Sequence, residues 1–487
     1  MNEIDFVDCT FRDAQASLWG EKMNTAMMYK IAPMMNRAGF RAFDATGISH
    51  FEFAVRYLRE NPWERMRLLS KAIPGTPLSL MMLGNSLTLF KVTAGPIMAL
   101  WMKRLAANGI RRVQLMEASN FMGDMSDGVR FAKDAGLEVV VALTYSHSPV
   151  HTDEYYAKKA RDAVKLAPDV IYLKDPGGLL TPERTRTLVP SIQKNIDGMP
   201  LEMHSHCTTG LAPLCYLEAM NLGVKTFHTA ISTLANGPSQ PSTENILRNA
   251  RHMGYASNLD EEALEAIAAH FREVAKKEGL PTGEPLEYDS FQYEHQVPGG
   301  VISNLKRQLG QLNFEHRLEE VLEETVLVRK ELGYPIMVTP FSQFVVTQAT
   351  LNVTQGERYK AITDEVIRFA LGLYGEQVSP VDQDLMDRIM SLPRTKDFID
   401  WKPEEVSIED LRGELEANLS DDELLLLVLS PEKDFEAMRA AGPINTDYSG
   451  ADKPMVTFIK ELMKRKNSTY ISIQKEDLSL TLKKSVN

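Results

Sequence analysis

The chain has little cysteine and no long uncharged apolar run. Its 487 residues include only Cys9, Cys207 and Cys215, and so small and odd a number cannot supply a disulfide framework. This usage is typical of a reducing compartment, so we expect a cytoplasmic location. No run of about 18 consecutive apolar residues is present, so we expect no transmembrane segment. The first residues lack the basic and apolar parts of a signal peptide, so we expect none.

An excess of positive charge is also missing. The sequence has 54 Lys and Arg residues against 66 Asp and Glu residues, which gives a formal net charge of −12. Nucleic acid is therefore excluded as the main partner, because phosphate binding needs a basic surface. Hydrophobic residues make up 44% of the chain and charged residues 25%, proportions typical of a globular protein with a large core.

Short apolar runs alternate with amphipathic helical stretches over about the first 230 residues. Alternating strands and helices predict a parallel sheet, and eight such units predict a closed (β/α)8 TIM barrel within the α/β class. An open doubly wound sheet is the alternative, but no G-x-G-x-x-G follows the first strand. The predicted strands span residues 4–10, 40–47, 78–83, 110–117, 138–145, 169–175, 201–206 and 224–230.

The pattern after the barrel is mostly helical. We predict a barrel domain at 1–260, a helical extension at 261–392, and an acidic helical region at 393–487. The last residues alternate polar and apolar side chains on both sides of Lys475–Asp477, which predicts a terminal β-hairpin. This small tail is a candidate docking element.

Chemically capable side chains stand at the ends of three predicted strands. Arg12 and Asp13 follow the first strand, Lys174 ends the sixth, and His204 and His206 end the seventh. In a TIM barrel these ends meet at one face, and residues i and i+2 of a strand point to the same side. Two imidazoles and a carboxylate are suitable ligands for Zn²⁺ or Mn²⁺.

Each of these residues also has a purely structural interpretation. Asp13 could cap a helix, Lys174 could pair with its neighbour Asp175, and each histidine could be a hydrogen-bonded interior group. The convergence of three strand ends favours the metal site over these alternatives.

Seven motifs support a family resemblance that extends from about residue 3 to residue 385. In this order and number they resemble the carboxyltransferase domain of pyruvate carboxylase and of the oxaloacetate decarboxylase α subunit. The motifs are FRDAQASLWGEKM, YLKDPGGLLTP, HSHCTTGLA, ANGPSQPSTENIL, YEHQVPGGVISNLKRQL, VTPFSQFVVTQATLNV and GERYK.

The resemblance implies a metal-binding site. Asp13, His204 and His206 would be ligands of a divalent metal, zinc or manganese. Lys174 would be a carbamylated lysine that completes the ligand set. Such chemistry is physically reasonable, because a lysine desolvated beside a cation has a lowered pKa and its neutral amine can capture CO₂.

Further site residues follow from the same resemblance. Thr208 would shuttle a proton between biotin and the substrate, although a local cap or turn hydroxyl is the alternative. Arg12 would line the substrate and biotin pocket, so Thr208, Arg12 and Lys174 are the predicted catalytic residues. The predicted substrate and biotin pocket consists of Arg12, Gln15, Leu83, Tyr145 and Thr208. Residues 261–392 would form a helical funnel over the barrel mouth.

The implied function is that of a carboxyltransferase subunit of a multi-subunit biotin-dependent carboxylase, a ligase. It would move CO₂ between carboxybiotin and an enolisable ketone or 2-oxo acid. No phosphate-binding loop and no biotinylation motif is present, so biotin would be carried on another chain. The expected partners are a biotin carboxyl carrier protein and an ATP-dependent biotin carboxylase, around a homodimeric core.

Three positions of the predicted pocket region depart from the family pattern. Leu83 replaces an arginine that holds the pyruvate carboxylate, and Ala16 replaces a glutamine, with Gln15 where the family has histidine. Either Lys91 or Arg12 takes over the carboxylate, or the substrate is more apolar there. We favour an enolisable ketone or a larger oxo acid, because an unpaired buried carboxylate is costly.

Two other functions are open to the sequence. The nearest is a metal-dependent aldolase, lyase or Claisen-type condensing enzyme of the hydroxymethylglutaryl-CoA lyase and isopropylmalate synthase type. These enzymes share the Arg-Asp and H-x-H elements but lack the lysine ligand and the funnel motif. A catalytically silent scaffold subunit is the second, and the intact set of predicted ligands argues against it.

Overall fold

The computed structural model divides the chain into two compact units, Met1–Asn445 and Thr446–Asn487. The predicted segment boundaries at 260 and 392 both lie inside the first unit. Within the described residues, no helix is long and apolar enough to cross a membrane. The structure describes residues 2–88, 91–311, 313–402, 406–414, 419–448, 470–475 and 478–483.

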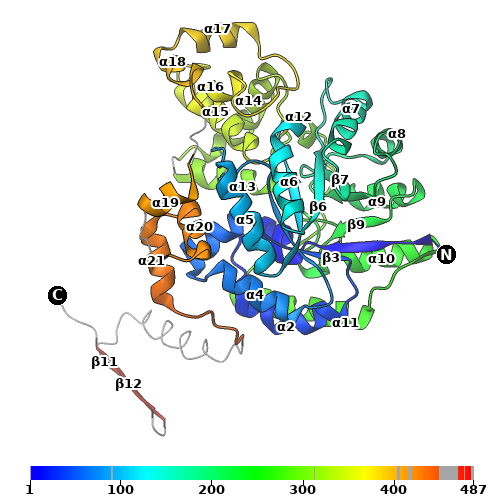
Figure 1. The fold of residues 1–487 in the computed structure, drawn as a ribbon, viewed down its shortest axis with the longest axis vertical. Helices are drawn as coiled ribbons and strands as arrows, with labels where there is room; N and C mark the ends of the chain where they lie inside the picture. Colours follow the sequence, from blue (N-terminus) through cyan, green and yellow to red (C-terminus); the bar gives the residue numbers. More distant parts are fainter. Residues whose placement is uncertain are drawn as a thin grey trace. The chain divides into compact units, whose positions relative to one another are not determined.

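Eight parallel strands, β2 to β9, close into a barrel in chain order (Figure 1). Each strand pairs in parallel with the next, and β9 pairs with β2 to close the barrel. The predicted TIM barrel is confirmed, and all eight predicted strands are present. They are β2 (Asp5–Asp8), β3 (Ala42–Gly47), β4 (Leu78–Leu83), β5 (Ile110–Met116), β6 (Glu138–Thr144), β7 (Val170–Asp175), β8 (Leu201–Ser205) and β9 (Thr226–Thr229).

Helices cover the outside of the barrel, which is why the strands are apolar on both faces. Thr152, Thr181 and Ser242 begin three of these helices, each accepting a backbone N–H three residues on, as good N-caps do. The helices are α2 (Thr25–Arg37), α3 (Ile48–Phe53), η2 (Ala54–Leu58), α4 (Pro62–Ala72), α5 (Gly95–Ala107), η3 (Met122–Met125), α6 (Ser126–Asp134), α7 (Asp153–Val164), α8 (Pro182–Gln193), α9 (Ala212–Asn221), η4 (Ser232–Leu234), α10 (Thr243–His252) and α11 (Glu261–Glu278).

A tight turn follows the first barrel strand. The π-helical segment η1 (Thr10–Ala14) leads directly into α1 (Gln15–Trp19). This turn holds the Arg-Asp pair at the C-terminal end of β2, where barrel enzymes place their chemistry. At the start of the chain, β1 (Asn2–Glu3) pairs in parallel with β10 (Tyr255–Ala256).

The helical funnel packs onto the barrel through a shared hydrophobic core. Met81 of β4 and Met116 of β5 belong to the same buried cluster as Phe341 and Phe344 of α15. The two parts are therefore one packed body rather than separate modules. The funnel helices are α12 (Gln292–His295), α13 (Gly299–Gln311), η5 (Glu315–Arg317), α14 (Leu318–Glu331), α15 (Phe341–Gln355), α16 (Asp364–Ala370) and α17 (Gln383–Ser391) (Figure 1).

The acidic region after the funnel returns to the side of the barrel. Asp422 accepts hydrogen bonds from Arg104 (2.7 Å) and Asn108 (3.1 Å) at the end of α5, so this segment is fixed to the barrel wall. The first elements of this region, η6 (Pro393–Thr395) and α18 (Lys396–Ile399), still lie beside α17, and Phe398 belongs to the buried cluster of the funnel (Figure 1). They are followed by α19 (Ile408–Glu414), α20 (Asp421–Leu429) and α21 (Glu432–Ala441), of which α20 contacts α3 and α5 (Figure 1, orange).

The second unit contains the predicted hairpin. Strands β11 (Tyr470–Lys475) and β12 (Leu478–Lys483) pair antiparallel, with Tyr470 opposite Lys483 and Lys475 opposite Leu478. These two strands coincide with the residues for which the sequence analysis predicts the two arms of a terminal β-hairpin.

Candidate metal and carboxyl-transfer site

The predicted metal ligands meet at the C-terminal ends of three barrel strands. Asp13 comes from the turn after β2, Lys174 from β7, and His204 and His206 from the end of β8. Lys174 and His204 are register partners on neighbouring strands. All four side chains are buried, so the grouping lies inside the barrel mouth and not on the open surface.

One carboxylate oxygen is the centre of the group. Oδ2 of Asp13 lies 3.3 Å from Nε2 of His204, 3.5 Å from Nε2 of His206 and 3.7 Å from Nζ of Lys174. Oxygen and nitrogen atoms from four side chains, each able to bind a metal ion, therefore face one small volume. Asp13, His204 and His206 each offer one ligand atom there, and these atoms lie within 4.8 Å of one another.

Arg12 fixes the carboxylate from the other side. Its NH2 group donates to Asp13 Oδ2 at 2.9 Å, and its Nε donates to Asp44 Oδ2 at 2.6 Å. Burial alone would raise the pKa of Asp13, but Arg12, His206 and Lys174 together hold it well below its usual range. Asp13 is thus a permanent anion. Arg12 is already engaged by two carboxylates, so its predicted contact with the substrate stays a prediction.

The histidine hydrogen bonds leave both Nε2 atoms facing inward. Nδ1 of His206 lies 2.6 Å from the carbonyl oxygen of Pro238, which can only accept a hydrogen bond, so Nδ1 carries the proton. Nε2 of His206 accepts from Gln240 at 3.1 Å, a hydrogen bond that a metal bound at this nitrogen would replace. Burial and the nearby Lys174 hold the pKa of His204 well below its usual range, so His204 is neutral.

His204 supplies the observation that tests whether a metal fits. Its Nε2 atom is buried and has no hydrogen-bond partner among the residues that the structure describes. Leaving a buried polar atom unpaired is unfavourable, and a cation at the centre of the group would satisfy it. Two imidazoles, a carboxylate and an amine that can become a carbamate form a set of ligands suited to a divalent cation.

Lys174 faces this group, and its neighbour Asp175 faces away from it. Burial lowers the pKa of the Lys174 ammonium, which increases the share of the neutral amine. Asp175 accepts hydrogen bonds from the backbone N–H groups of Leu179 and Leu180 and from the Ser205 hydroxyl. Strand alternation separates the two side chains, so a Lys174–Asp175 ion pair does not explain the lysine.

Thr208 is held against a neighbouring turn. Its half-buried hydroxyl donates to the carbonyl oxygen of Gly177 in the turn after β7. Gly178 has a positive φ of 62°, and a Cβ there would clash with the Thr208 hydroxyl, so the two turns are tightly packed. The role of Thr208 in proton transfer stays a prediction.

Two residues predicted to bind substrate or biotin are satisfied internally. Gln15 is fully buried; its amide donates to the Phe11 carbonyl and accepts from the Met23 N–H, both at 3.4 Å. Tyr145 is 1% exposed, and its ring packs 5.6 Å from that of Tyr156. Their substrate contacts stay predictions, and this packing gives each of them a structural role.

A cavity lies over the ends of β4 and β5, beneath the funnel. Leu83 and Ala118 belong to its barrel side and Phe341 to its funnel side, so part of the wall is apolar. Charged groups of both signs complete it. Its lining is Leu83, Asn85, Ser86, Lys91, Val92, Glu117, Ala118, Asp124, Pro340, Phe341, Arg368, Leu373, Tyr374 and Trp401.

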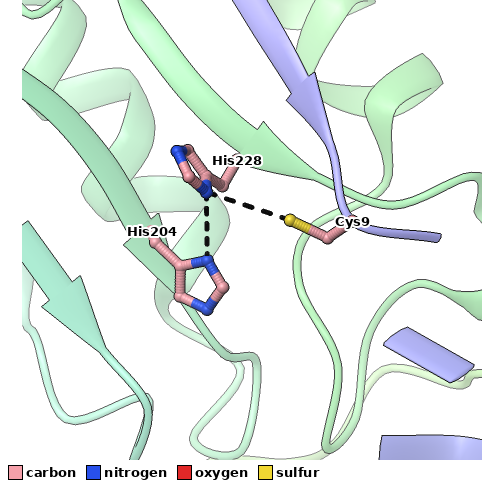
Figure 2. Close-up of side chains that lie close together, drawn as sticks. All are labelled: Cys9, His204 and His228. Carbon is pink, nitrogen blue, oxygen red and sulfur yellow. Dashed lines mark hydrogen bonds between the residues drawn. The ribbon is translucent and has the colours of Figure 1, made fainter. Parts of the chain in front are cut away.

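A second group of polar side chains lies on the other side of His204 and was missed by the sequence analysis. Figure 2 shows His204 Nδ1 and Cys9 Sγ both directed at Nδ1 of His228, at 3.4 and 3.9 Å. Nε2 of His228 lies 2.9 Å from Glu202 Oε2. The available signal was Glu202, an acidic residue two positions before His204 and therefore on the same side of the strand.

Family models and relatives agree with the observed fold. A model described as "Conserved carboxylase domain" matches residues 293–479, and one described as "HMGL-like" matches residues 110–270. A pyruvate carboxylase subunit of Methanocaldococcus jannaschii is 39% identical over 390 residues, covering 80% of this chain and 68% of that protein. The methylmalonyl-CoA carboxyltransferase 5S subunit of Propionibacterium freudenreichii subsp. shermanii is 30% identical, with 91% and 89% covered.

Solved structures share the fold. The carboxyl transferase domain of Rhizobium etli pyruvate carboxylase, determined with pyruvate, superposes with a TM-score of 0.83 at 21% identity. The match covers 99% of this chain and 83% of that one. The chain therefore belongs to the biotin-dependent carboxyltransferase family of pyruvate carboxylase and its relatives. It is an enzyme of that family, a carboxyltransferase subunit.

Proposed function

We propose that this subunit moves a carboxyl group between biotin and an enolisable ketone or 2-oxo acid at a divalent-metal site. The observation that carries the proposal is the convergence of Asp13, Lys174, His204 and His206 on one point in the barrel mouth. The sequence motifs of the carboxyltransferase family include all four residues.

Asp13, His204 and His206 would hold the metal, zinc or manganese, through Oδ2 and the two Nε2 atoms. A divalent cation bound there supplies electrostatic stabilisation for the negative charge that develops on an enolate. Arg12 keeps Asp13 ionised and fixed in position. The Pro238 carbonyl orients the ring of His206 with Nε2 inward, as partners of ligand histidines do in metal sites.

Lys174 would complete the ligand set as a carbamate. Its neutral amine attacks CO₂, a new N–C bond forms, one C–O π bond becomes an oxygen anion, and the nitrogen loses a proton to water. Burial favours the neutral amine that this reaction needs. The resulting anionic oxygen is a better ligand for a hard cation than the amine it replaces.

Thr208 would hold the proton that moves in the reaction. In the observed position its hydroxyl donates to Gly177, and a rotation about χ1 frees it to donate elsewhere. In the carboxylation direction, Thr208 would give its hydroxyl proton to the ureido nitrogen of biotin as CO₂ leaves. It would then take up a proton from the carbon of the substrate that becomes the enolate.

The cavity at Leu83 supports a substrate larger or more apolar than pyruvate. An aliphatic side chain stands where the family has an arginine, so it cannot form the bidentate carboxylate contact that a guanidinium makes. Lys91 and Arg368 also line the cavity. A carboxylate farther from the reacting carbon could reach them, which favours a larger oxo acid over a short one.

The partners follow from the chemistry that carboxyl transfer needs beside this site. Biotin would be attached to a biotin carboxyl carrier protein, and a separate ATP-dependent biotin carboxylase would load it with CO₂. We place this assembly in the cytoplasm, with a homodimeric core. All three cysteines are buried free thiols, as expected in a reducing compartment. The β11–β12 hairpin is a candidate docking element for the carrier.

A second function is favoured by the HMGL-like match over residues 110–270. It is metal-dependent aldol cleavage or Claisen condensation, which uses the same Arg-Asp and H-x-H elements. Lys174 in the ligand group and the carboxylase-domain match at 293–479 favour carboxyl transfer.

Co-purification tests the proposed function. Affinity-tagged chain isolated from its own cells should retain a biotinylated protein that avidin detects. The isolated complex should carboxylate one or more members of a panel of ketones and 2-oxo acids with ATP and bicarbonate. A complex without biotin that cleaves a 3-hydroxy acyl thioester would establish the lyase function instead.

A further inference from the structure

A chain of buried hydrogen bonds extends from His204 away from the metal side. Nδ1 of His204 lies 3.4 Å from Nδ1 of His228, and Nε2 of His228 lies 2.9 Å from Oε2 of Glu202 (Figure 2 shows the two rings). Arg112 donates to the same Glu202 oxygen at 2.5 Å. All four side chains are at most 1% exposed, so water does not compete with these contacts.

The charges of the groups in this row of hydrogen bonds determine which ring nitrogens carry a proton. Arg112 is always a donor, and its ion pair keeps Glu202 an acceptor-only carboxylate. Nε2 of His228 therefore carries the proton and donates to Glu202. Nδ1 of the neutral His228 ring is then a bare lone pair, which can only accept.

The same logic then applies to His204. Since Nδ1 of His228 accepts, Nδ1 of His204 must carry the proton and donate to it. Nε2 of His204 is left with a lone pair, and this is the buried atom that lies 3.3 Å from Asp13 Oδ2. The imidazole thus presents to the site the nitrogen that a metal requires, in the tautomer that a metal requires.

Packing holds the His228 ring in the plane that this contact needs. The ring of Tyr172 is stacked on it, with centroids 5.3 Å apart and an interplanar angle of 8°. The Tyr172 hydroxyl points elsewhere and contacts the sulfur of Met81 at 3.7 Å.

A second metal bound by Cys9, His204 and His228 is the competing interpretation of the group in Figure 2. It would require His204 to use both ring nitrogens as ligands, which means losing the Nδ1 proton. Cys9 is fully buried, and burial together with the nearby Asp44 and Asp13 raises the pKa of its thiol well above the usual range. A protonated thiol is a poor ligand.

We propose that Glu202 and His228 are positioning residues that fix the tautomer and orientation of His204 for metal binding. The presence of a metal in this inference rests on the proposed function. The order of donors and acceptors among Glu202, His228 and His204 is independent of that function. Neither residue touches the substrate or the reacting atoms.

The hydrogen-bond order can be tested on the metal-free full-length chain by ¹⁵N NMR with labelled histidine. His204 should be protonated at Nδ1 and His228 at Nε2, with each resonance assigned from the spectra of His204→Gln and His228→Asn. Protonation of His204 at Nε2 would overturn the proposal whether or not the chain binds metal.

The effect on binding can be tested by titrating metal-free chain with Zn²⁺ or Co²⁺. His228→Leu removes the acceptor and should weaken binding by about 10- to 100-fold, the usual cost of losing such a partner. His228→Asn keeps an acceptor oxygen near the position of Nδ1 and should restore most of the affinity. Equal affinity of wild type and His228→Leu would overturn the proposal.

Tyr172→Phe is the matched control, since it keeps the stacked ring and loses only the hydroxyl contact with Met81. It should bind metal like the wild type, and circular dichroism should show all variants folded. A stoichiometry of two metal ions per chain, falling to one in Cys9→Ala, would establish the competing two-metal site. If His228→Leu does not fold, the NMR spectrum of the wild type still decides the question.

Discussion

Oδ2 of Asp13 lies 3.3 Å from Nε2 of His204, although β9 separates their strands in the barrel. The π-helical turn after β2 brings the carboxylate across the mouth to the end of β8. This contact places one anionic oxygen opposite an unpaired nitrogen in a buried site. The arrangement is unfavourable for two hydrogen-bond acceptors alone and favourable for two ligands of one cation.

Metal content should depend on the histidines and not on the fold. His206→Ala removes one ligand nitrogen and should lower the affinity for Zn²⁺ or Mn²⁺ by at least about tenfold, with unchanged circular dichroism. Elemental analysis after dialysis measures the loss. His252→Ala, a substitution of an exposed histidine on α10, is the control and should retain the metal. Full metal content in His206→Ala would contradict the proposed ligand set.

Lys174 should carry a CO₂ adduct that disappears on acidification. Native mass spectrometry in bicarbonate buffer should show the adduct on the wild type and not on Lys174→Arg. The reason is that a guanidinium has no neutral amine to react. The metal affinity of Lys174→Arg should also be lower than that of the wild type, because the carbamate ligand is lost with the adduct.

Lys159→Arg is the matched control for Lys174, because Lys159 is also buried but pairs with Glu376 at 3.0 Å. It should keep the adduct. An adduct that persists in Lys174→Arg and is lost in Lys159→Arg would show that Lys159 carries the modification, which would contradict the proposed carbamate at Lys174.

Leu83 should select against pyruvate. Leu83→Arg restores a guanidinium at the cavity wall and should raise kcat/KM for pyruvate by about 10- to 100-fold, the effect of one bidentate charge-assisted contact. Steady-state kinetics of the reconstituted complex on pyruvate and on longer 2-oxo acids measure the change. Leu83→Met is the control of similar volume. Efficient use of pyruvate by the wild type would contradict the proposal of a larger or more apolar substrate.

Glu117 should make the stability of the chain fall with rising pH. Burial raises the pKa of this carboxyl from 4.5 to about 7, and the repulsion of Asp124 adds to it, against hydrogen bonds from Ser119 and Phe121. Between these two values the folded chain keeps a proton that the unfolded chain has released. The free energy of unfolding therefore decreases through that window, by about 3 kcal/mol at most, and is constant above it.

Urea denaturation of the wild type and of Glu117→Gln from about pH 5 to about pH 8 measures this effect. The stability of the wild type relative to the variant should decline across the series. Asp127→Asn, at an exposed carboxylate on α6, should follow the wild type at every pH. A constant difference between wild type and Glu117→Gln would show that Glu117 is ionised in the folded state.

The sequence was sufficient to predict the barrel, because the pattern of apolar strands and amphipathic helices is periodic and repeated. Eight apolar runs separated by helical stretches left few alternative architectures. Strand ends such as those at Asp13 and His204 could therefore be assigned to one face from the sequence alone. The terminal hairpin was predictable for the same reason, from simple alternation.

The contacts that the sequence could not predict lie where the backbone departs from a regular element or where neighbouring strands meet. Gln15 follows a π-helical turn, and its amide bonds to the backbone of Phe11 and Met23. The Glu202–His228 pair was missed because its meaning depends on a contact between neighbouring strands. Buried charged groups of this kind are rare, and only their partners reveal why they are there.

The most direct test of the account is transfer of a ¹³C-labelled carboxyl group from carboxybiotin to an acceptor by the metal-loaded chain, followed by NMR. We predict labelled product with a ketone or a 2-oxo acid longer than pyruvate, and at least about 100-fold slower transfer for Asp13→Asn, which loses the anionic ligand. Undiminished transfer after metal removal and in Asp13→Asn would contradict the account.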